Sequence, residues 1–503
     1  MSLKLKDGTF VELGASIIYS GNTLVKEMVE SDPELTTYSP GETCSDVHKN
    51  EKLDQTKHDM PTGFGVWDTP NGFSILTSTM SDIWTNFYLF YHYNIDLLRM
   101  SNAVSKVIKS FDQIYKNLES NHANSFFSSP DEVWHSVGLL GPSRISFDEF
   151  LDSIGISKDI SSWFKLLNSN VGNLRKHLLA GANLSNYNQN NSKMNGLAGL
   201  VSFVPTASKI FAVCEGNGMI PISAFSQAKK VLKNRCNGSK RKIEHIAKRV
   251  TTVIANADGM LELRSGDESH GEYDIVILAA PLQQCRISFF LQSHVDTAIL
   301  LPMPLNGMVD SDGIDADEHP LFPRSLPSSA TRTYTQTITT VISNGRLQHK
   351  YFNITESQIP QSIYFTEEGK RKEKIHSISQ LTADGIFKML SSEKLSRDIL
   401  EAFFGSDCKV EFIKEWGGEF GGAYPDFNGG GENSVSTQFL LYDGGVKKQA
   451  RQSSGAALYY VSAMEASVSA LEISAIGAKA VSKLVAQRIG ILHETKVKLR
   501  DEL

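Results

Sequence analysis

The chain has 503 residues, of which 41% are hydrophobic and 21% charged, and its formal net charge is −6. This composition is typical of a globular protein with two or three domains, and the negative charge argues against a general nucleic-acid binder. No apolar run approaches the roughly 20 residues that a transmembrane helix needs. The cysteines are scattered without a CxxC pair, which disfavours a zinc site and leaves one or two disulfides open.

The patterned segments begin with DGTFVELGAS (residues 7–16), where turn residues precede an alternating stretch and then small residues. Residues 84–109 are rich in aromatic side chains at helical spacing and predict a helix. Residues 246–253 predict a strand, and residues 260–264 predict its hairpin partner.

The second half contains two further signals. YDIVILAAPL (residues 273–282) is nearly all apolar, which is typical of a strand inside a parallel sheet covered by helices. Residues 458–487 predict a strand, a small-residue turn and a long helix whose N-terminus could stabilise an anion. The same alanine and serine spacing would also permit plain helix-on-sheet packing. Alternating strands and helices indicate an α/β fold.

Several segments, in their order along the chain, resemble the prenylcysteine oxidase (prenylcysteine lyase) family of the flavin amine oxidase-like superfamily. They are DGTFVELGAS, GFGVWD (63–68), NFYLFYHYNIDLLRMSNAV (86–104), NGLAGLVSF (195–203), CEGN (214–217), DIVILAAPL (274–282), GGAYPDF (421–427) and LYYVSAMEASVSALEISAIGAKA (458–480). No single motif is decisive, but the combination is fairly specific.

The resemblance implies a Rossmann-like FAD/NAD(P)-binding domain interleaved with an α+β substrate-binding domain. We expect the FAD-binding domain at residues 1–45, 205–290 and 430–490. We expect the prenylcysteine lyase-type substrate domain at residues 60–204 and 291–429, and a charged tail at residues 491–503. The family's opening strand, GxGxxG turn and helix have no counterpart in the sequence, so the FAD-binding domain is expected to be N-terminally incomplete.

By the same resemblance, FAD would lie against residues from three segments: Glu12, Gly14, Ala15, Ser16, Ala279, Ala280, Pro281, Glu465, Leu471, Glu472 and Ile473. The alternative interpretation of Glu12 and Glu465 is that they are helix caps or exposed charges on strands. We expect no metal and no catalytic side chain, because hydride transfer to the flavin performs the difficult step.

The implied reaction cleaves S-farnesyl- or S-geranylgeranyl-cysteine with oxygen to give cysteine, a prenyl aldehyde and hydrogen peroxide. The prenyl tail needs an apolar tunnel, and the candidates to line it include Phe87, Phe90, Tyr91, Tyr93 and Leu97. Arg99 and His92 are candidate partners for the zwitterionic cysteine end. Each of these residues could instead belong to an ordinary core or surface.

Two other functions stay open. One is a related flavin amine oxidase with another substrate, and the other is a catalytically dead lipid-binding remnant. The ending RDEL and the glycosylation-type triplets at Asn183, Asn190, Asn237 and Asn353 suggest an endomembrane lumen (lysosome, vacuole or ER). The sequence shows no signal peptide, and it leaves peripheral membrane contact and oligomeric state open.

Overall fold

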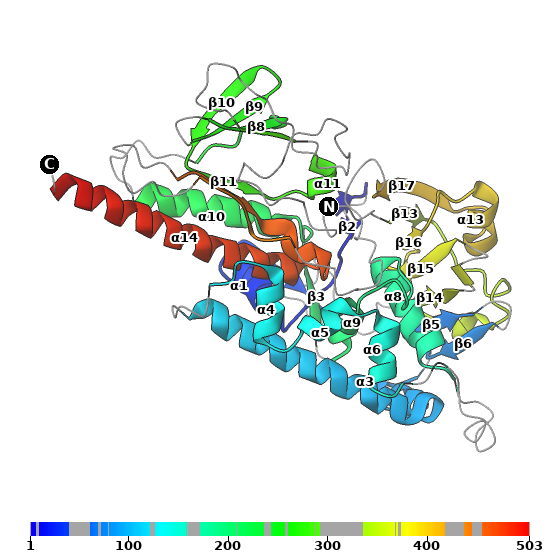
Figure 1. Cartoon of the computed structure of the whole chain (residues 1–503). Helices are drawn as coiled ribbons and strands as arrows, with labels where there is room; N and C mark the ends of the chain where they lie inside the picture. Colours follow the sequence, from blue (N-terminus) through cyan, green and yellow to red (C-terminus); the bar gives the residue numbers. More distant parts are fainter. Residues whose placement is uncertain are drawn as a thin grey trace, which may run out of the picture. The chain divides into compact units, whose positions relative to one another are not determined.

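The computed structural model of the chain describes residues 2–6, 10–39, 61–68, 72–78, 80–120, 126–156, 158, 172–207, 209–235, 243–256, 260–285, 287–291, 335–367, 369–370, 374–417, 437–444 and 455–501. The chain forms two compact units that are both discontinuous in sequence (Figure 1). The first comprises residues 1–110, 141–227 and 333–430, and the second comprises residues 111–140, 228–332 and 431–503.

A seven-stranded sheet organises the first unit. Its strand order is β17 (Lys409–Trp416), β13 (Thr337–Ser343), β16 (Phe387–Ser391), β15 (Ile375–Gln380), β14 (Ser362–Phe365), β5 (Phe64–Trp67) and β6 (Phe73–Leu76). All pairs are antiparallel except β14 with β5. The sequence TITTVIS of β13 is rich in β-branched residues, which suit a strand with neighbours on both sides.

A buried hydrophobic cluster of this unit is formed by side chains of the sheet and of helix α13 (Arg397–Phe404). Phe403 and Phe404 of α13 pack into this cluster with Phe365 of β14 and with Phe387 and Met389 of β16. Helix α8 (Ala180–Tyr187) packs on β14 and β15, as Figure 1 shows. The other elements that begin in this unit are β1 (Ser2–Lys4), β2 (Phe10–Glu12), β3 (Ile18–Tyr19), α1 (Thr23–Glu30), β4 (Thr37–Tyr38), α3 (Asp82–Glu119), α6 (Phe147–Ser153), η3 (Arg175–Leu179), α9 (Gly196–Val201), η4 (Val204–Ala207), β7 (Ile210–Val213), α10 (Met219–Arg235) and η7 (Glu356–Gln358).

The second unit contains two smaller sheets. One has the order β11 (Ile275–Leu278), β19 (Ala457–Tyr460) and β18 (Leu440–Asp443), with β11 parallel to β19. The other has the order β10 (Glu268–Tyr273), β9 (Leu261–Ser265), β8 (Thr252–Ala255) and β12 (Ser288–Leu291). Its helices include α4 (Pro130–Ser136), α11 (Leu282–Cys285), the 3-10 turn η9 (Val461–Ala466) and α14 (Leu471–Asp501).

Most of the expected elements are present. The aromatic helix lies within α3, which is kinked at Asn94, where φ is 52°. The expected hairpin forms from β8 and β9, but β8 begins at Thr252, so the strand expected from residue 246 is wrong over most of its length. The prediction that the apolar segment 273–282 is buried on both faces is also incomplete, because Ile277 of β11 is 49% exposed. The insertions expected at residues 428–433 and 443–455 fall mainly outside the described residues.

The structural units divide the chain differently from the expected domains. Residues 1–45 were assigned to the FAD-binding domain by resemblance, whereas the structure groups them with the seven-stranded sheet. The physical reason is that side chains of β13 and β16 hydrogen-bond the backbone of residues 12–14. Helix α14 continues to Asp501, through most of the expected tail. Among the described residues, no helix combines the length and the apolar character that crossing a bilayer requires.

Candidate cofactor and substrate sites

The carboxylate of Glu12 is buried at the end of β2 in the first unit. It accepts hydrogen bonds from the backbone N–H of Asn217 and, at 2.8 Å, from the hydroxyl of Ser2. The turn that brings Asn217 there needs Gly216, whose φ is +95° and whose added Cβ would lie 2.8 Å from Oε1 of Glu12. Glu12 is therefore an internal anchor for the chain, rather than the helix cap or exposed strand charge of the alternative interpretation.

A buried lysine holds the residues that follow Glu12. The Nζ atom of Lys388, on β16, lies 3.2 Å from the carbonyl oxygen of Glu12, 3.5 Å from that of Gly14 and 2.9 Å from Oγ of Ser16. Burial lowers the pKa of Lys388 to about 8, although the carboxylate of Glu12 acts in the opposite direction. The ammonium and its neutral form are therefore both accessible near neutral pH.

Two more side chains of the sheet fix the same segment. The hydroxyl of Thr339 on β13 donates to the carbonyl of Leu13 at 2.8 Å, and the indole N–H of Trp416 on β17 donates to that hydroxyl at 3.0 Å. The Trp416 ring lies 3.8 Å from where a Cβ of Gly14 would be. Residues 12–16 are thus held in a defined conformation by three neighbouring strands.

The resemblance points to Glu12, Gly14, Ala15 and Ser16, but it gives no indication of Lys388, Thr339 or Trp416. A signal for Lys388 was present, because a lysine stands between Phe387 and Met389 in an otherwise buried strand. A charged residue in such a position is rare unless it has a partner. The sequence alone does not show which backbone it meets.

In the second unit, the expected cofactor residues follow parallel strands. Ala279, Ala280 and Pro281 lie directly after β11, and the turn η9 directly follows the neighbouring strand β19. Ligands of open α/β sheets bind outside the carboxyl ends of such strands. The small side chains of Ala279 and Ala280 would allow a ring or a phosphate to approach the backbone.

The turn before α14 carries the other expected residues. Glu465 accepts a hydrogen bond from Ser469 at 3.4 Å, and Ser467 accepts one from the indole N–H of the fully buried Trp134 at 2.9 Å. At the start of α14, Leu471 is 37% exposed, whereas Glu472 and Ile473 are buried. Of these helix residues, only Leu471 offers an exposed side chain, and Glu472 and Ile473 would act through the backbone or through packing.

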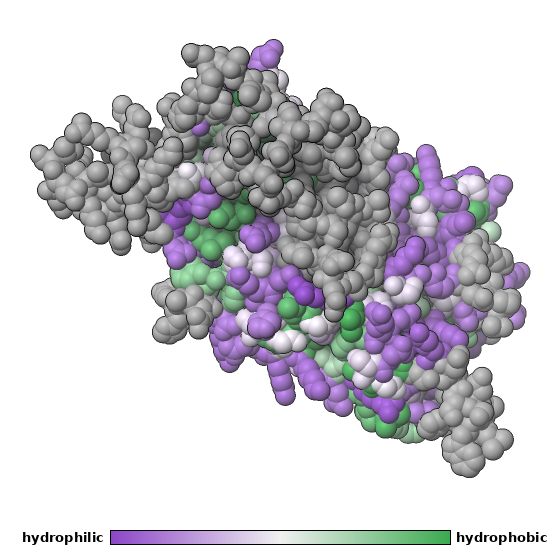
Figure 2. Space-filling model, in the orientation of Figure 1, coloured by the Kyte–Doolittle hydropathy of each residue, from purple (hydrophilic) through white to green (hydrophobic). Residues whose placement is uncertain are grey.

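The expected tunnel residues lie on α3 with different exposures. Phe87, Phe90 and Tyr91 are 61%, 44% and 50% exposed, whereas Tyr93 is buried and Leu97 half-buried. Figure 2 shows hydrophobic surface at the lower right, where Figure 1 draws the beginning of α3. Phe87, Phe90 and Tyr91 form an exposed apolar strip in the structure, and the role of the five residues as the lining of a tunnel stays a prediction.

The expected partners of the cysteine end have other contacts. Arg99 pairs with Asp96 at 3.0 Å and donates to the carbonyl of Gly155 at 2.6 Å. Burial lowers the pKa of the His92 imidazole to about 4, and His177 acts in the same direction. His92 is therefore neutral near pH 7 and supplies no positive charge there, while the role of Arg99 stays a prediction.

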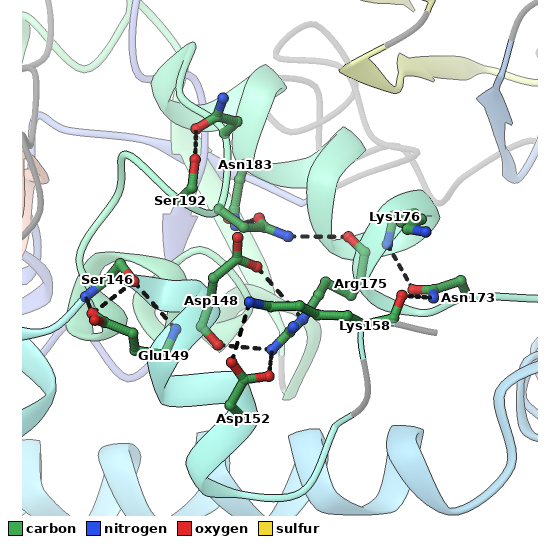
Figure 3. A network of polar contacts seen from close by, with 12 residues as sticks. Ser146, Asp148, Glu149, Asp152, Lys158, Asn173, Arg175, Lys176, Asn183 and Ser192 are labelled. Carbon is green, nitrogen blue, oxygen red and sulfur yellow. Dashed lines mark hydrogen bonds and ion pairs between the residues drawn. The ribbon is translucent and has the colours of Figure 1, made fainter. Parts of the chain in front are cut away.

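A polar network supports the loop of residues 188–194, which we call the asparagine loop (Figure 3). The side-chain amide of Asn191 donates to the carbonyl of Arg175 at 3.0 Å and accepts from the amide of Asn183 at 2.9 Å. Asn183 is fully buried, so its glycosylation-type triplet does not present a glycan site in this fold. The triplet at Asn353 is exposed, and the one at Asn237 lies outside the described residues.

The guanidinium of Arg175 ties the same network to α6. It donates to the carbonyl of Asp148 at 2.7 Å and to Oδ1 of Asp152 at 2.9 Å, and only 4% of the Arg175 side chain is exposed (Figure 3). At the start of α6, Ser146 and Glu149 form a reciprocal capping box. The asparagine loop is thus backed by buried hydrogen bonds and an ion pair that tie it to η3 and α6.

Comparisons with known proteins find a family model and relatives that match most of the chain. A family model described as prenylcysteine lyase matches residues 76–300 and 314–498. The chain is 22% identical to the farnesylcysteine lyase of Arabidopsis thaliana, over 96% of this chain and 78% of that protein. It is 24% identical to prenylcysteine oxidase 1 of Pongo abelii, over 97% of this chain and 81% of that protein.

Among solved structures, a putrescine oxidase variant redesigned in its cofactor binding superposes with a TM-score of 0.50. The match covers 97% of this chain and 90% of that one at 12% identity. This likeness concerns the fold alone, and it confirms the α/β class with a Rossmann-like domain that the sequence predicts.

Proposed function

Because the chain belongs to the prenylcysteine lyase family, we propose that it is an FAD-dependent thioether oxidase that cleaves S-prenyl-L-cysteine. The observation that carries this proposal is the match of the family model to residues 76–300 and 314–498, most of the chain. The family and the fold support an oxidoreductase. The named substrate, FAD and the products are the finer part of the proposal.

The described residues suit a flavin dinucleotide. Residues 14–16 are small and sit in a backbone held by Lys388, Thr339 and Trp416. In the second unit, Ala279 and Ala280 follow a parallel strand, and Leu471 opens a long helix whose N–H groups favour an anion. We therefore assign these residues, together with Glu12, Pro281, Glu465, Glu472 and Ile473, to holding FAD.

The reaction balances without an acidic or basic catalytic side chain. When bound, FAD would take a hydride from the allylic carbon next to sulfur and pass two electrons to oxygen. Water then adds to that carbon, and the carbon–sulfur bond breaks. One thioether, one water and one oxygen molecule become one prenyl aldehyde, one cysteine and one hydrogen peroxide. The protein's contribution is to bind, to orient and to exclude other water.

The test combines absorbance with product analysis. The full chain is purified, supplied with FAD and freed of unbound cofactor, and we expect it to keep flavin absorbance. With S-farnesyl-L-cysteine it should release peroxide, thiol and aldehyde in equal amounts. A flavin-loaded protein that makes no peroxide from farnesyl- or geranylgeranyl-cysteine would contradict the proposal.

Putrescine serves as the second substrate in the same assay, because the fold likeness to putrescine oxidase favours amine oxidation as the alternative. Peroxide from putrescine without peroxide from prenylcysteine would establish an amine oxidase instead. A colourless protein that binds farnesylcysteine without turnover would indicate the lipid-binding remnant.

We also propose that the protein works in an oxidising lumen. Cys214 is disulfide-bonded, and disulfides persist mainly in such compartments. Mass spectrometry of protein from the native source, alkylated with and without prior reduction, should find Cys214 alkylated only in the reduced sample.

A further inference from the structure

A polar pocket of about 350 Å³ lies in the first unit. Ligand pockets are commonly lined by hydrophobic side chains with a few polar groups. Here all the described lining residues are polar: Asn188, Gln189, Asn190, Lys193, Thr335, Gln336, Glu367 and Lys370. Such a lining suits a small charged group rather than an apolar one.

Asn188 builds one wall of the pocket. It ends α8 in the left-handed conformation, with φ at 52°. Its amide nitrogen donates to the carbonyl of Gln336 at 2.7 Å and to Oγ1 of Thr337 at 3.1 Å, and its Oδ1 accepts from Nζ of Lys370 at 2.7 Å. Asn188 therefore positions the ammonium of Lys370 and joins three segments that are far apart in the sequence.

The ammonium of Lys370 has capacity for a ligand. An ammonium carries three N–H donors, and Asn188 is its one hydrogen-bond partner among the described residues. Asn188 is itself held by hydrogen bonds to Gln336 and Thr337, so it fixes the position of Nζ of Lys370 and leaves the other N–H donors to a ligand. The asparagine loop behind it is held by Asn183 and Arg175 (Figure 3), so little ordering is needed when a ligand binds.

The charges in the pocket are of both signs, with positive charge in excess. Burial lowers the pKa of Lys370; the carboxylate of Glu367 opposes this effect, and Lys193 and Lys374 reinforce it. An anion beside Lys370 would relieve the repulsion among these lysines. Glu367 in the same lining provides an acceptor for a cation.

We propose that this pocket binds the α-carboxylate and α-ammonium of a free amino acid, with Lys370 facing the carboxylate and Glu367 facing the ammonium. Resting on the proposed function, the pocket would take the cysteine end of S-prenyl-L-cysteine. It would then distinguish a fully released prenylcysteine from the same residue inside a peptide, because a peptide bond removes one or both of these charges.

The probe for the test is S-methyl-L-cysteine, which has the zwitterionic end and no prenyl tail. Its binding to the full chain is measured by calorimetry beside its methyl ester, which lacks the carboxylate, and its N-acetyl derivative, which lacks the ammonium. We expect S-methyl-L-cysteine to bind, and we expect the affinity of each derivative to be lower by at least about tenfold. Equal binding of all three, or no binding of S-methyl-L-cysteine, would overturn the proposal without any mutant.

Two variants assign the charges to side chains. K370M should weaken the binding of S-methyl-L-cysteine by about tenfold or more. It should leave the binding of the methyl ester unchanged, because the ester has no carboxylate for Lys370 to contact. E367Q should weaken the binding of S-methyl-L-cysteine but not that of the N-acetyl derivative, because this derivative has no ammonium for Glu367 to contact. K350M, which removes an exposed lysine outside the pocket, is the matched control and should bind like the wild type. If K370M keeps its native circular dichroism and binds normally, the assignment is wrong.

Failure of this inference is distinct from failure of the proposed function. A chain that binds S-methyl-L-cysteine in this charge-dependent way but oxidises no prenylcysteine supports the pocket and contradicts the oxidase. A chain that oxidises farnesylcysteine with the same KM in K370M as in the wild type supports the oxidase and overturns the pocket.

Proton uptake gives an independent signature, because an anion that raises the pKa of Lys370 makes the binding enthalpy depend on the buffer's ionisation heat.

Discussion

The Nζ atom of Lys388 lies 2.9 Å from Oγ of Ser16, although the two residues are separated by 372 positions in the sequence. The same ammonium reaches the carbonyls of Glu12 and Gly14. One buried charge thus holds a whole segment of backbone that we assign to the cofactor. The position of this charge has consequences for stability that can be measured without cofactor or substrate.

The first prediction concerns the pH dependence of stability in K388M. Burial lowers the pKa of Lys388 from 10.5 to about 8, which corresponds to about 3 kcal/mol between the two protonation states. Between pH 8 and 10.5 the unfolded chain still holds this proton and the folded chain has released it. The free energy of unfolding of the wild type should therefore rise with pH in this window relative to K388M.

Urea unfolding of both proteins, followed from about pH 7 upward, measures this difference. As the pH falls from 8 toward 7, the difference between wild type and K388M should level off, because the lysine becomes protonated in both states. K350M removes an exposed lysine and should show no such trend. A wild-type to K388M difference that is flat across the whole range would show that Lys388 titrates normally.

The second prediction couples Glu12 to this titration. The carboxylate of Glu12 raises the pKa of Lys388 against the effect of burial. E12Q removes that charge while keeping the side-chain shape, so the window of pH-dependent stability should begin at a lower pH than in the wild type. It should also cost about 1–3 kcal/mol, because Asn217 and Ser2 would then donate to a neutral group.

The measurement is the same urea series on E12Q, with E34Q as an exposed glutamate control. We expect E34Q to follow the wild type in both stability and pH dependence. If E12Q were as stable as the wild type with an unmoved window, the carboxylate would not be the internal anchor that the structure indicates.

Helices and strands could be predicted from the sequence better than the contacts between distant residues. β11, β19 and the helix of α3 follow from runs of apolar or aromatic residues, which reflect local burial. The strand expected at residues 246–253 (IAKRVTTV) is mostly absent because its first half carries the charges of Lys248 and Arg249, which are exposed to solvent. Local patterns therefore identified the type of each element more reliably than its ends.

The candidate sites depend on contacts between distant segments, which no local pattern encodes. The segment at Glu12 could be selected by resemblance, but its support by Lys388 and Thr339 depends on how β13 and β16 pair. The polar pocket likewise joins Asn188, Gln336 and Lys370. Each of these residues taken alone looks like an ordinary loop or surface residue.

The third prediction concerns the support of the asparagine loop. Arg175 is 4% exposed, whereas its partner Asp152 is 47% exposed. Removing the buried cation in R175M should cost about 1–3 kcal/mol, because the carbonyl of Asp148 loses its hydrogen-bond donor in the interior. D152N should cost about 1 kcal/mol or less, because the solvated partner contributes little.

Thermal and urea unfolding of the two variants test this asymmetry. R175K keeps the charge but loses the fork geometry, so it should fall between wild type and R175M. S-methyl-L-cysteine binding provides a second readout, and we expect R175M to weaken it by loosening the loop that carries Asn188. Equal destabilisation by R175M and D152N would mean that the charge pair itself, rather than the buried guanidinium, is what matters.

The last prediction links the turn before α14 to the cofactor. The indole N–H of Trp134 donates to Ser467 at 2.9 Å, and Trp134 is fully buried. In S467A this donor would lose its acceptor, which should cost about 1–3 kcal/mol. Because Ser467 lies between Glu465 and Leu471, loosening this turn should also weaken FAD retention, which absorbance after gel filtration measures.

A double-mutant cycle separates the hydrogen bond from packing. W134F removes the donor and part of the ring, so S467A should cost less in the W134F background than in the wild type. S474A is the matched control, because its hydroxyl donates only to a carbonyl of the preceding helical turn and is exposed. It should retain FAD like the wild type. If S467A lowers stability but not FAD retention, the turn supports α14 without positioning Glu465 or Leu471 for the cofactor.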